Sequence, residues 1–154
     1  MAGVQLQFRP EGLQAINDYI TRLARALGDT RPLLEAVGGV VESQTRRRLG
    51  EDKEGPDGEA WPEWSERYAK TRRQGHKLLE NEGDLLDSIH YVVGTDAVEI
   101  GSGLVYAAIQ HFGGEEAGQP ALPARPFLGV GTDDAVELLD VLGDFGRRAL
   151  EGRA

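Results

Sequence analysis

Residues 106–114 read YAAIQHFGG and, after a polar spacer, residues 122–129 read LPARPFLG. The apolar spacing of the first string predicts two turns of helix that end at the glycine pair, because glycine adopts a left-handed backbone at little steric cost. The two prolines of the second string exclude a continuous helix and hold the residues before them extended. We therefore expect a stiff arm over residues 122–129 that presents the guanidinium of Arg125 from a defined place.

On either side of these strings, apolar side chains and turn residues recur with the spacing of regular secondary structure. Residues 135–149 repeat apolar side chains at steps of three and four, and Asp134 followed by Glu137 matches a capping box. This pattern predicts a helix that starts at Asp134 and runs to about Leu150. Upstream, residues 89–93 and 97–101 flank a Gly-Thr-Asp turn and predict a β-hairpin.

The N-terminal third predicts one strand and two helices. Residues 4–9 alternate apolar and polar side chains, as a half-buried strand does. Apolar stripes along residues 12–27 and about 30–50 predict two helices, and the short turn between them predicts a helical hairpin. The Gly38-Gly39 pair in the second helix costs about 1 kcal/mol per glycine relative to alanine, so we expect a bend or a close helix crossing there.

Together these elements predict an α+β fold. A small, mostly antiparallel sheet packs against the N-terminal helical hairpin and the C-terminal helix, with a last strand between residues 113 and 131. The 154 residues fit a single domain, residues 1–154, with one core of ordinary size.

The stretch around residues 50–64 is rich in charge, glycine and proline, and predicts a long flexible loop that moves or protrudes. Ser65, a good helix cap, precedes a basic stretch up to Lys77 that we expect to be helical. The simpler interpretation is that one tryptophan, Trp61, anchors the loop and the basic residues form a hydrated helix face. The alternative is that Trp64 and the basic helix dock an acidic partner or a phosphate backbone.

Three motifs follow one another in the last two thirds of the chain. They are Asp57-Gly58-x-x-Trp61-Pro62, then Leu79-x-x-x-Gly83-x-Leu85-x-x-Ser88-Ile89, then the two strings quoted first. In this order they resemble the phage virion morphogenesis family, the tail completion proteins of Mu-like and related tailed phages. The resemblance implies a structural, non-enzymatic protein that completes the tail and joins it to the head as an oligomeric ring. It implies tail-tube, terminator and head-connector proteins as partners, and the virion neck or tail as its location, after assembly in the host cytoplasm.

Composition excludes several functions. Cysteine is absent, so there is no disulfide framework, thiolate metal site or cysteine nucleophile. A net charge of −9 opposes general binding to nucleic acid or anionic lipid, and we expect no sequence-specific nucleic-acid partner. The first residues lack the basic and apolar regions of a signal peptide, and no apolar run approaches membrane-spanning length.

Catalytic and cofactor motifs are not found. His76, His90 and His111 are dispersed, which argues against a zinc site, and we expect His111 to interact with the last carbonyls of its helix. Acidic side chains crowd residues 80–87, at Glu80, Glu82, Asp84 and Asp87. They support an alternative function, a small metal-dependent hydrolase or nuclease-like factor, although they lack calcium-loop spacing and a solvated acidic surface is the simpler interpretation.

The candidate interaction residues are aromatic or basic: Trp61, Trp64, Tyr106, Arg125 and Phe127. In an assembly protein, Arg125 pairs with an acidic group of the same core or of an adjacent subunit, and Phe127 fills an apolar pocket. The alternative is that both residues serve only the core of the monomer. For Tyr106 the simpler interpretation is a half-buried packing residue with its hydroxyl at the surface, and not a catalytic acid.

Overall fold

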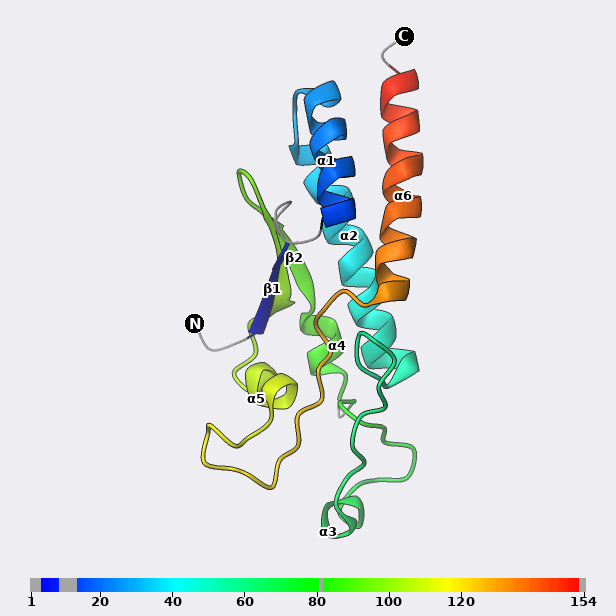
Figure 1. Cartoon of the computed structure of the whole chain (residues 1–154). Helices are drawn as coiled ribbons and strands as arrows, with labels where there is room; N and C mark the ends of the chain where they lie inside the picture. Colours follow the sequence, from blue (N-terminus) through cyan, green and yellow to red (C-terminus); the bar gives the residue numbers. More distant parts are fainter. Residues whose placement is uncertain (1–3, 9–13, 81, 153–154) are drawn as a thin grey trace.

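The computed structural model describes residues 4–8, 14–80 and 82–152 (Figure 1). Its elements in chain order are β1 (Val4–Phe8), α1 (Gln14–Leu27), α2 (Arg31–Arg47), the π-helical turn η2 (Arg48–Asp52), α3 (Glu66–Ala69), α4 (Asp84–Ser88), β2 (His90–Val93), β3 (Val98–Ser102), α5 (Ala107–Phe112) and α6 (Thr132–Glu151). The predicted α+β class is confirmed. The predicted end of the first strand, at Arg9 and Pro10, and the predicted start of the first helix, at Gly12, lie outside the described residues.

The sheet has three antiparallel strands in the order β1-β3-β2. Strand β3 lies in the middle, where Ile100 is opposite Leu6 on β1 and Tyr91 on β2. Strands β2 and β3 form the predicted hairpin within one residue of its expected ends. Valine and isoleucine side chains of β3 are buried, as expected for the central strand of a sheet that packs against a helix.

Helix α2 forms the middle layer of the molecule. The sheet packs on one side of it, and α6 packs on the other side together with α1 (Figure 1). A glycine explains the close approach to the sheet: a Cβ atom on Gly38 would lie 2.5 Å from Cδ2 of Tyr91. The close contact expected at the glycine pair is therefore made with strand β2, and not with another helix.

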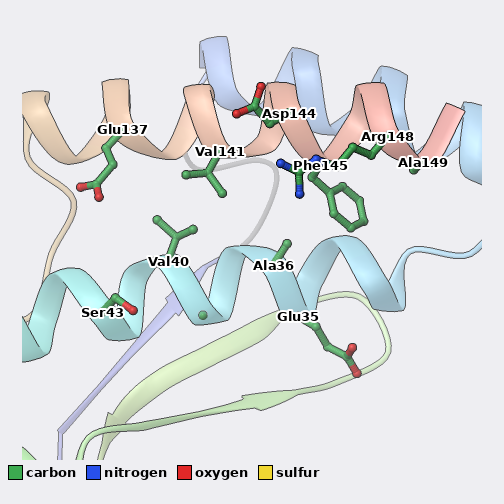
Figure 2. Close-up of a pocket in the computed structure, with 11 residues that line it drawn as sticks. Glu35, Ala36, Val40, Ser43, Glu137, Val141, Asp144, Phe145, Arg148 and Ala149 are labelled. Atoms are coloured by element: carbon green, nitrogen blue, oxygen red, sulfur yellow. The ribbon is translucent and has the colours of Figure 1, made fainter. Parts of the chain in front are cut away.

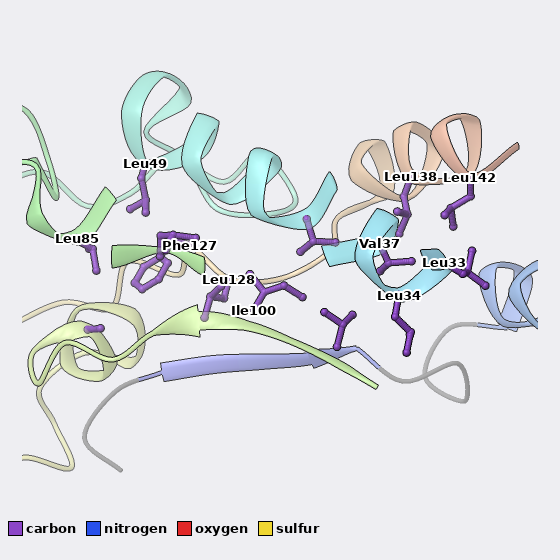
Figure 3. Packing of buried hydrophobic residues seen from close by; sticks show 14 of the residues in the cluster. Leu33, Leu34, Val37, Leu49, Leu85, Ile100, Phe127, Leu128, Leu138 and Leu142 are labelled. Carbon is purple, nitrogen blue, oxygen red and sulfur yellow. The ribbon is translucent and has the colours of Figure 1, made fainter. Parts of the chain in front are cut away.

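The core lies along α2, on both of its buried faces. Figure 3 shows leucine and valine side chains of α2 between the sheet and α6, with Phe127 and Leu128 entering the same layer from the arm. The fully enclosed apolar side chains include Leu33, Val37, Val41, Ile89, Val98, Ile100, Phe127, Leu138 and Leu142. At about 25 cal/mol per Å² of buried apolar surface, this cluster supplies most of the driving force for folding.

The structure corrects three predictions of local structure. Residues 113–131 form no strand. The basic stretch after Ser65 is helical for only one turn, α3, and turns follow from residue 71 onward. Helix α6 begins at Thr132, two residues before the predicted start. Among the described residues, no helix combines the length and the apolar character needed to cross a bilayer.

Candidate interaction site

The polar backbone groups of the arm, residues 122–131, are paired mostly with side chains instead of a neighbouring strand. Nδ1 of His111 accepts a hydrogen bond from the Phe127 N–H at 3.2 Å, and the indole of Trp61 donates to the Pro126 carbonyl at 2.8 Å. The Arg125 N–H donates to the Gln110 carbonyl at 2.9 Å. Since buried backbone groups must be paired, these contacts replace the ladder bonds that the two prolines prevent.

A buried ion pair fixes the C-terminal end of the arm. Arg48 donates through Nη1 to the Phe127 carbonyl at 2.6 Å, and through Nη2 to Oδ2 of Asp134 at 2.6 Å. The same carboxylate oxygen accepts the Gly131 N–H at 2.9 Å and so caps α6. Both side chains are at most 9% exposed. Asp134 is thus the third residue of the helix, bonding back to the cap residue Gly131, and not the cap residue that the sequence pattern indicated.

A second set of hydrogen bonds joins α2 to α6 beside this ion pair. Nε2 of Gln44 donates to the Asp134 carbonyl at 3.0 Å and to Oε2 of Glu137 at 3.1 Å. Arg47 also bonds Glu137, at 3.0 Å. The bond from Arg47, and then that from Gln44, lowers the pKa of the Glu137 carboxyl. Glu137 therefore serves the helix contact and not the capping box expected for it.

Arg125 is buried and connects the arm to the loop that carries Trp61. Its Nε donates to the Pro62 carbonyl at 2.8 Å and its Nη2 to the Glu63 carbonyl at 3.1 Å. Burial lowers the pKa of this guanidinium, and the nearby Glu63 carboxylate opposes that effect. Within the chain, main-chain carbonyls take the place of the acidic side chain expected as its partner.

His111 and Phe127 form the inner side of the arm. Phe127 is fully buried, and its ring meets the imidazole edge-on with centroids 5.1 Å apart. Burial lowers the pKa of His111, which suits a neutral ring that accepts N–H bonds through Nδ1. The expectation that His111 interacts with the last carbonyls of its helix is wrong, because its partners are N–H groups of the arm.

The loop around residues 50–64 folds back onto the arm. A Cβ atom on Gly129 would lie 2.7 Å from Cγ of Pro56, and one on Gly131 would collide with the Pro56 carbonyl. Lys53 bonds the Leu78 carbonyl at 2.9 Å and Glu80 at 3.0 Å. Trp61 is buried, as expected for the anchor of the loop.

Residues 64–77, the basic tip, project from one end of the molecule around α3 (Figure 1). Trp64 and Tyr68 meet edge-on with ring centroids 6.0 Å apart, and the Arg72 guanidinium lies 5.8 and 5.4 Å from the two rings. Arg72 also contacts Nδ1 of His76 at 2.9 Å. This stacking stiffens a segment that has only one helical turn.

Exposed apolar side chains gather around α5. Val105 is 78% exposed, Phe112 70% and Tyr106 42%. Partial burial, and then the negative charge of Asp84, raise the pKa of the Tyr106 hydroxyl. The segment that leads to Tyr106 is joined to α4, because Ser88 bonds Ser102 at 2.6 Å and Ser102 accepts the Leu104 N–H at 3.2 Å.

An open groove of about 790 Å³ runs between α2 and α6 (Figure 2). Its apolar side chains are Ala36, Val40, Val141, Phe145 and Ala149. Charged side chains, Glu35, Glu137, Asp144 and Arg148, lie along its borders. The groove has the character of an opening between two packed helices and lacks convergent polar groups of the kind that orient a small ligand.

The sequence motifs quoted above span the arm, the loop and α4, the parts that these contacts join. A family model described as the phage virion morphogenesis family matches residues 12–145. The chain belongs to this family. The match includes α2, the basic tip, the arm and most of α6.

Relatives within the phage virion morphogenesis family come from Mu and Mu-like prophages. Mu-like prophage FluMu G protein 2 of Haemophilus influenzae is 30% identical over 134 residues, 86% of this chain and 89% of that protein. "Putative capsid assembly protein G" of Escherichia phage Mu is 31% identical over 120 residues, 73% of this chain and 76% of that protein. FluMu G protein 1 is 32% identical over 132 residues, 82% and 86% of the two chains. No solved structure matches the chain.

The acidic stretch of this family member does not converge on a metal position. Glu80 bonds Lys53, which lowers the pKa of its carboxyl, while Glu82, Asp84 and Asp87 are exposed. Within the described parts of the chain, no group of three or more histidine, aspartate or glutamate side chains is placed to hold a metal ion. Family membership supports a role in virion morphogenesis, a structural assembly process.

Sequence reasoning missed Arg48, Gln44 and Asp134 as the polar centre of this protein. Arg48 lies near the end of the helix predicted over about residues 30–50. A signal was present, since Leu34, Val37, Val41, Thr45 and Arg48 follow one another at steps of three and four. That spacing places Arg48 on the buried stripe of the helix, where a charge requires a partner.

Proposed function

We propose that this protein is a non-enzymatic structural component that completes the phage tail and joins it to the head, acting as an oligomeric ring. The match of residues 12–145 to the virion morphogenesis family carries the proposal. Its partners are further copies of itself, tail-tube or terminator proteins, and head-connector proteins. It acts in the host cytoplasm during assembly and stays in the neck or tail of the virion.

The distribution of polar contacts supports a structural role. The buried charged groups, Arg48, Asp134 and Arg125, are all engaged in fixing the arm and α6. These groups hold the surface elements in one arrangement. A protein that contacts the same neighbours repeatedly in an assembly requires such a fixed arrangement. The exposed aromatic side chains Tyr68, Tyr106 and Phe112 lie instead on the basic tip and at α5, where a neighbour can reach them.

Among the candidate residues, Trp61, Arg125 and Phe127 then act by supporting the arm, and Trp64 and Tyr106 provide direct contacts. Trp64 belongs to the stiffened basic tip, and Tyr106 is 42% exposed. Aromatic side chains at such positions commonly contribute most to the affinity of an interface.

Gene deletion in the phage or prophage that encodes this chain tests the proposal. Electron microscopy of induced lysates should show separate filled heads and tails that lack a joined neck. Wild-type protein supplied from a plasmid should restore joined particles, and antibody labelling should place it at the neck. Normal joined particles in the deletion lysate would contradict the proposal.

A further inference from the structure

We propose that the basic tip of one copy docks onto the acidic surface around α4 of the next copy. We define this acidic surface by Glu82, Asp84, Asp87, Val105 and Tyr106. The inference rests on the ring proposed above and names the contact that builds it. Each copy then offers the basic tip on one side and the acidic surface on the other.

The basic tip concentrates positive charge in an acidic protein. Residues 64–77 contain five basic side chains and one acidic side chain, whereas the whole chain carries a net charge of −9. Arg67, Lys70 and Arg73 are exposed, and none forms an ion pair with a side chain that the structure describes. Cations elsewhere, such as Arg46, Arg47, Arg48, Lys53 and Arg147, are paired with carboxylates.

The tip also offers an apolar centre. Tyr68 is 48% exposed, and its ring is held by Trp64 and Arg72. Fixing these long side chains before contact reduces the entropy lost on binding. An exposed aromatic on the same tip as the exposed cations Arg67, Lys70 and Arg73 fits a partner surface that combines apolar and acidic side chains.

The surface around α4 has these complementary properties. Glu82, Asp84 and Asp87 are exposed and, in the ranges that the structure covers, make no ion pair. Val105 and Tyr106 supply exposed apolar area. They lie beside α4, because the Ser88 hydroxyl bonds the Ser102 hydroxyl at 2.6 Å and Ser102 in turn accepts the Leu104 N–H at 3.2 Å. The charge and the apolar character of one surface thus match those of the other.

The arrangement favours a contact between copies. In Figure 1, α3 lies at one end of the molecule, apart from α4. Two different surfaces that bind each other make a heterologous interface, which closes into a ring when the rotation per copy permits it. A nucleic acid is a weaker fit for the tip, because the overall charge of −9 repels phosphates.

Charge exchange between copies tests the contact. Chain one carries Arg67→Glu, Lys70→Glu and Arg73→Glu in the tip, so its tip and its α4 surface are both acidic. Chain two carries Glu82→Lys and Asp87→Lys, so both of its surfaces are basic. Circular dichroism should show the helix content of the wild type for each chain, since all five side chains are exposed.

Light scattering should give masses that are multiples of 16.7 kDa for the wild type and a single chain mass for each variant alone. An equimolar mixture should again form assemblies of several chains, because alternating copies present opposite charges at each interface between them. Arg25→Glu, a reversal of an exposed cation on α1, should assemble like the wild type. The wild-type assembly should also dissociate as sodium chloride rises.

A mixture that stays monomeric would overturn this contact, and so would a tip-reversed chain that assembles alone. Neither result decides the role in the neck, which gene deletion tests separately. A wild-type chain that remains monomeric at 0.1 mM would likewise exclude docking between copies. Retention of duplex DNA by the wild type that is lost in the tip-reversed chain, with assembly intact, would assign the tip to nucleic acid and also overturn the inference.

Discussion

Arg48 Nη2 and Asp134 Oδ2 lie 2.6 Å apart in a buried ion pair that joins the end of α2 to the start of α6. Arg48→Ala should lower the free energy of unfolding by about 3 to 5 kcal/mol, since it leaves the Asp134 carboxylate buried without its partner. The loss corresponds to a fall of roughly 6 to 20 °C in the melting midpoint, which calorimetry can measure.

The matched control for this prediction is Arg31→Ala. Arg31 pairs with Glu35 at 3.2 Å, but both side chains are about half exposed or more. Such a surface pair contributes at most about 1 kcal/mol, so the midpoint should move little. Equal effects of the two substitutions would contradict the assignment of Arg48 as the central buried cation.

Arg125→Ala separates a supporting role from a direct contact with a neighbour. The substitution removes two hydrogen bonds to the Pro62 and Glu63 carbonyls, and we expect a loss of about 2 to 3 kcal/mol. Urea denaturation measures it, with Arg25→Ala as the exposed control that should stay within about 0.5 kcal/mol. An unchanged midpoint together with lost assembly would instead make Arg125 an interface residue.

Gly38→Ala should destabilise the protein, because the new methyl group would lie 2.5 Å from the Tyr91 ring. Overpacking of this kind costs about 1 to 3 kcal/mol. Gly39→Ala is the internal control: no atom lies within 4 Å of its Cβ position, and alanine favours helix by about 1 kcal/mol. Thermal melts should therefore move in opposite directions for these adjacent residues.

His111 should make stability depend on pH below about 6.5. Burial lowers its pKa from 6.5 in the folded chain, so below this value the unfolded chain binds a proton that the folded chain does not. Stability is then constant above pH 6.5 and falls as the pH decreases toward the folded pKa. The lowered pKa values of Glu80 and Glu137 act in a separate window, below 4.5.

Urea midpoints of the wild type and His111→Gln, measured from pH 5 to 8, test this dependence. The variant should lose the decline between pH 6.5 and 5, whereas His90→Gln, at an exposed strand position, should retain it. A decline of the same size in His111→Gln would attribute the effect to another group.

The sequence predicted the elements whose signal is local. The hairpin at residues 89–101, the helix over 107–112 and the apolar stripe of α6 depend on periodicity and turn residues, and all three are confirmed. The predicted length of the helix after Ser65 was wrong. Basic composition does not specify a helix when the following residues have no apolar stripe to bury.

The arm shows why the candidate site was harder to predict. Its two prolines correctly indicated extended, stiff backbone, but they could not reveal that side chains from four elements pair with that backbone. Trp61 and Arg48 are separated from their arm partners by 65 and 79 residues. Contacts at that separation leave no local pattern, so the sequence left open whether Arg125 serves the core or a neighbouring subunit, and it did not indicate the carbonyl partners of this buried side chain.

The long separation between Arg48 and Asp134 has a consequence during synthesis on the ribosome. The partners are 86 residues apart, so at 5 to 20 residues per second Asp134 is added roughly 4 to 17 seconds after Arg48. Until then the guanidinium that belongs in the core has no carboxylate to bind and stays in water. The middle layer of the molecule is therefore completed only once α6 has been synthesised, and a nascent chain stalled before α6 should be more sensitive to proteases than the full chain.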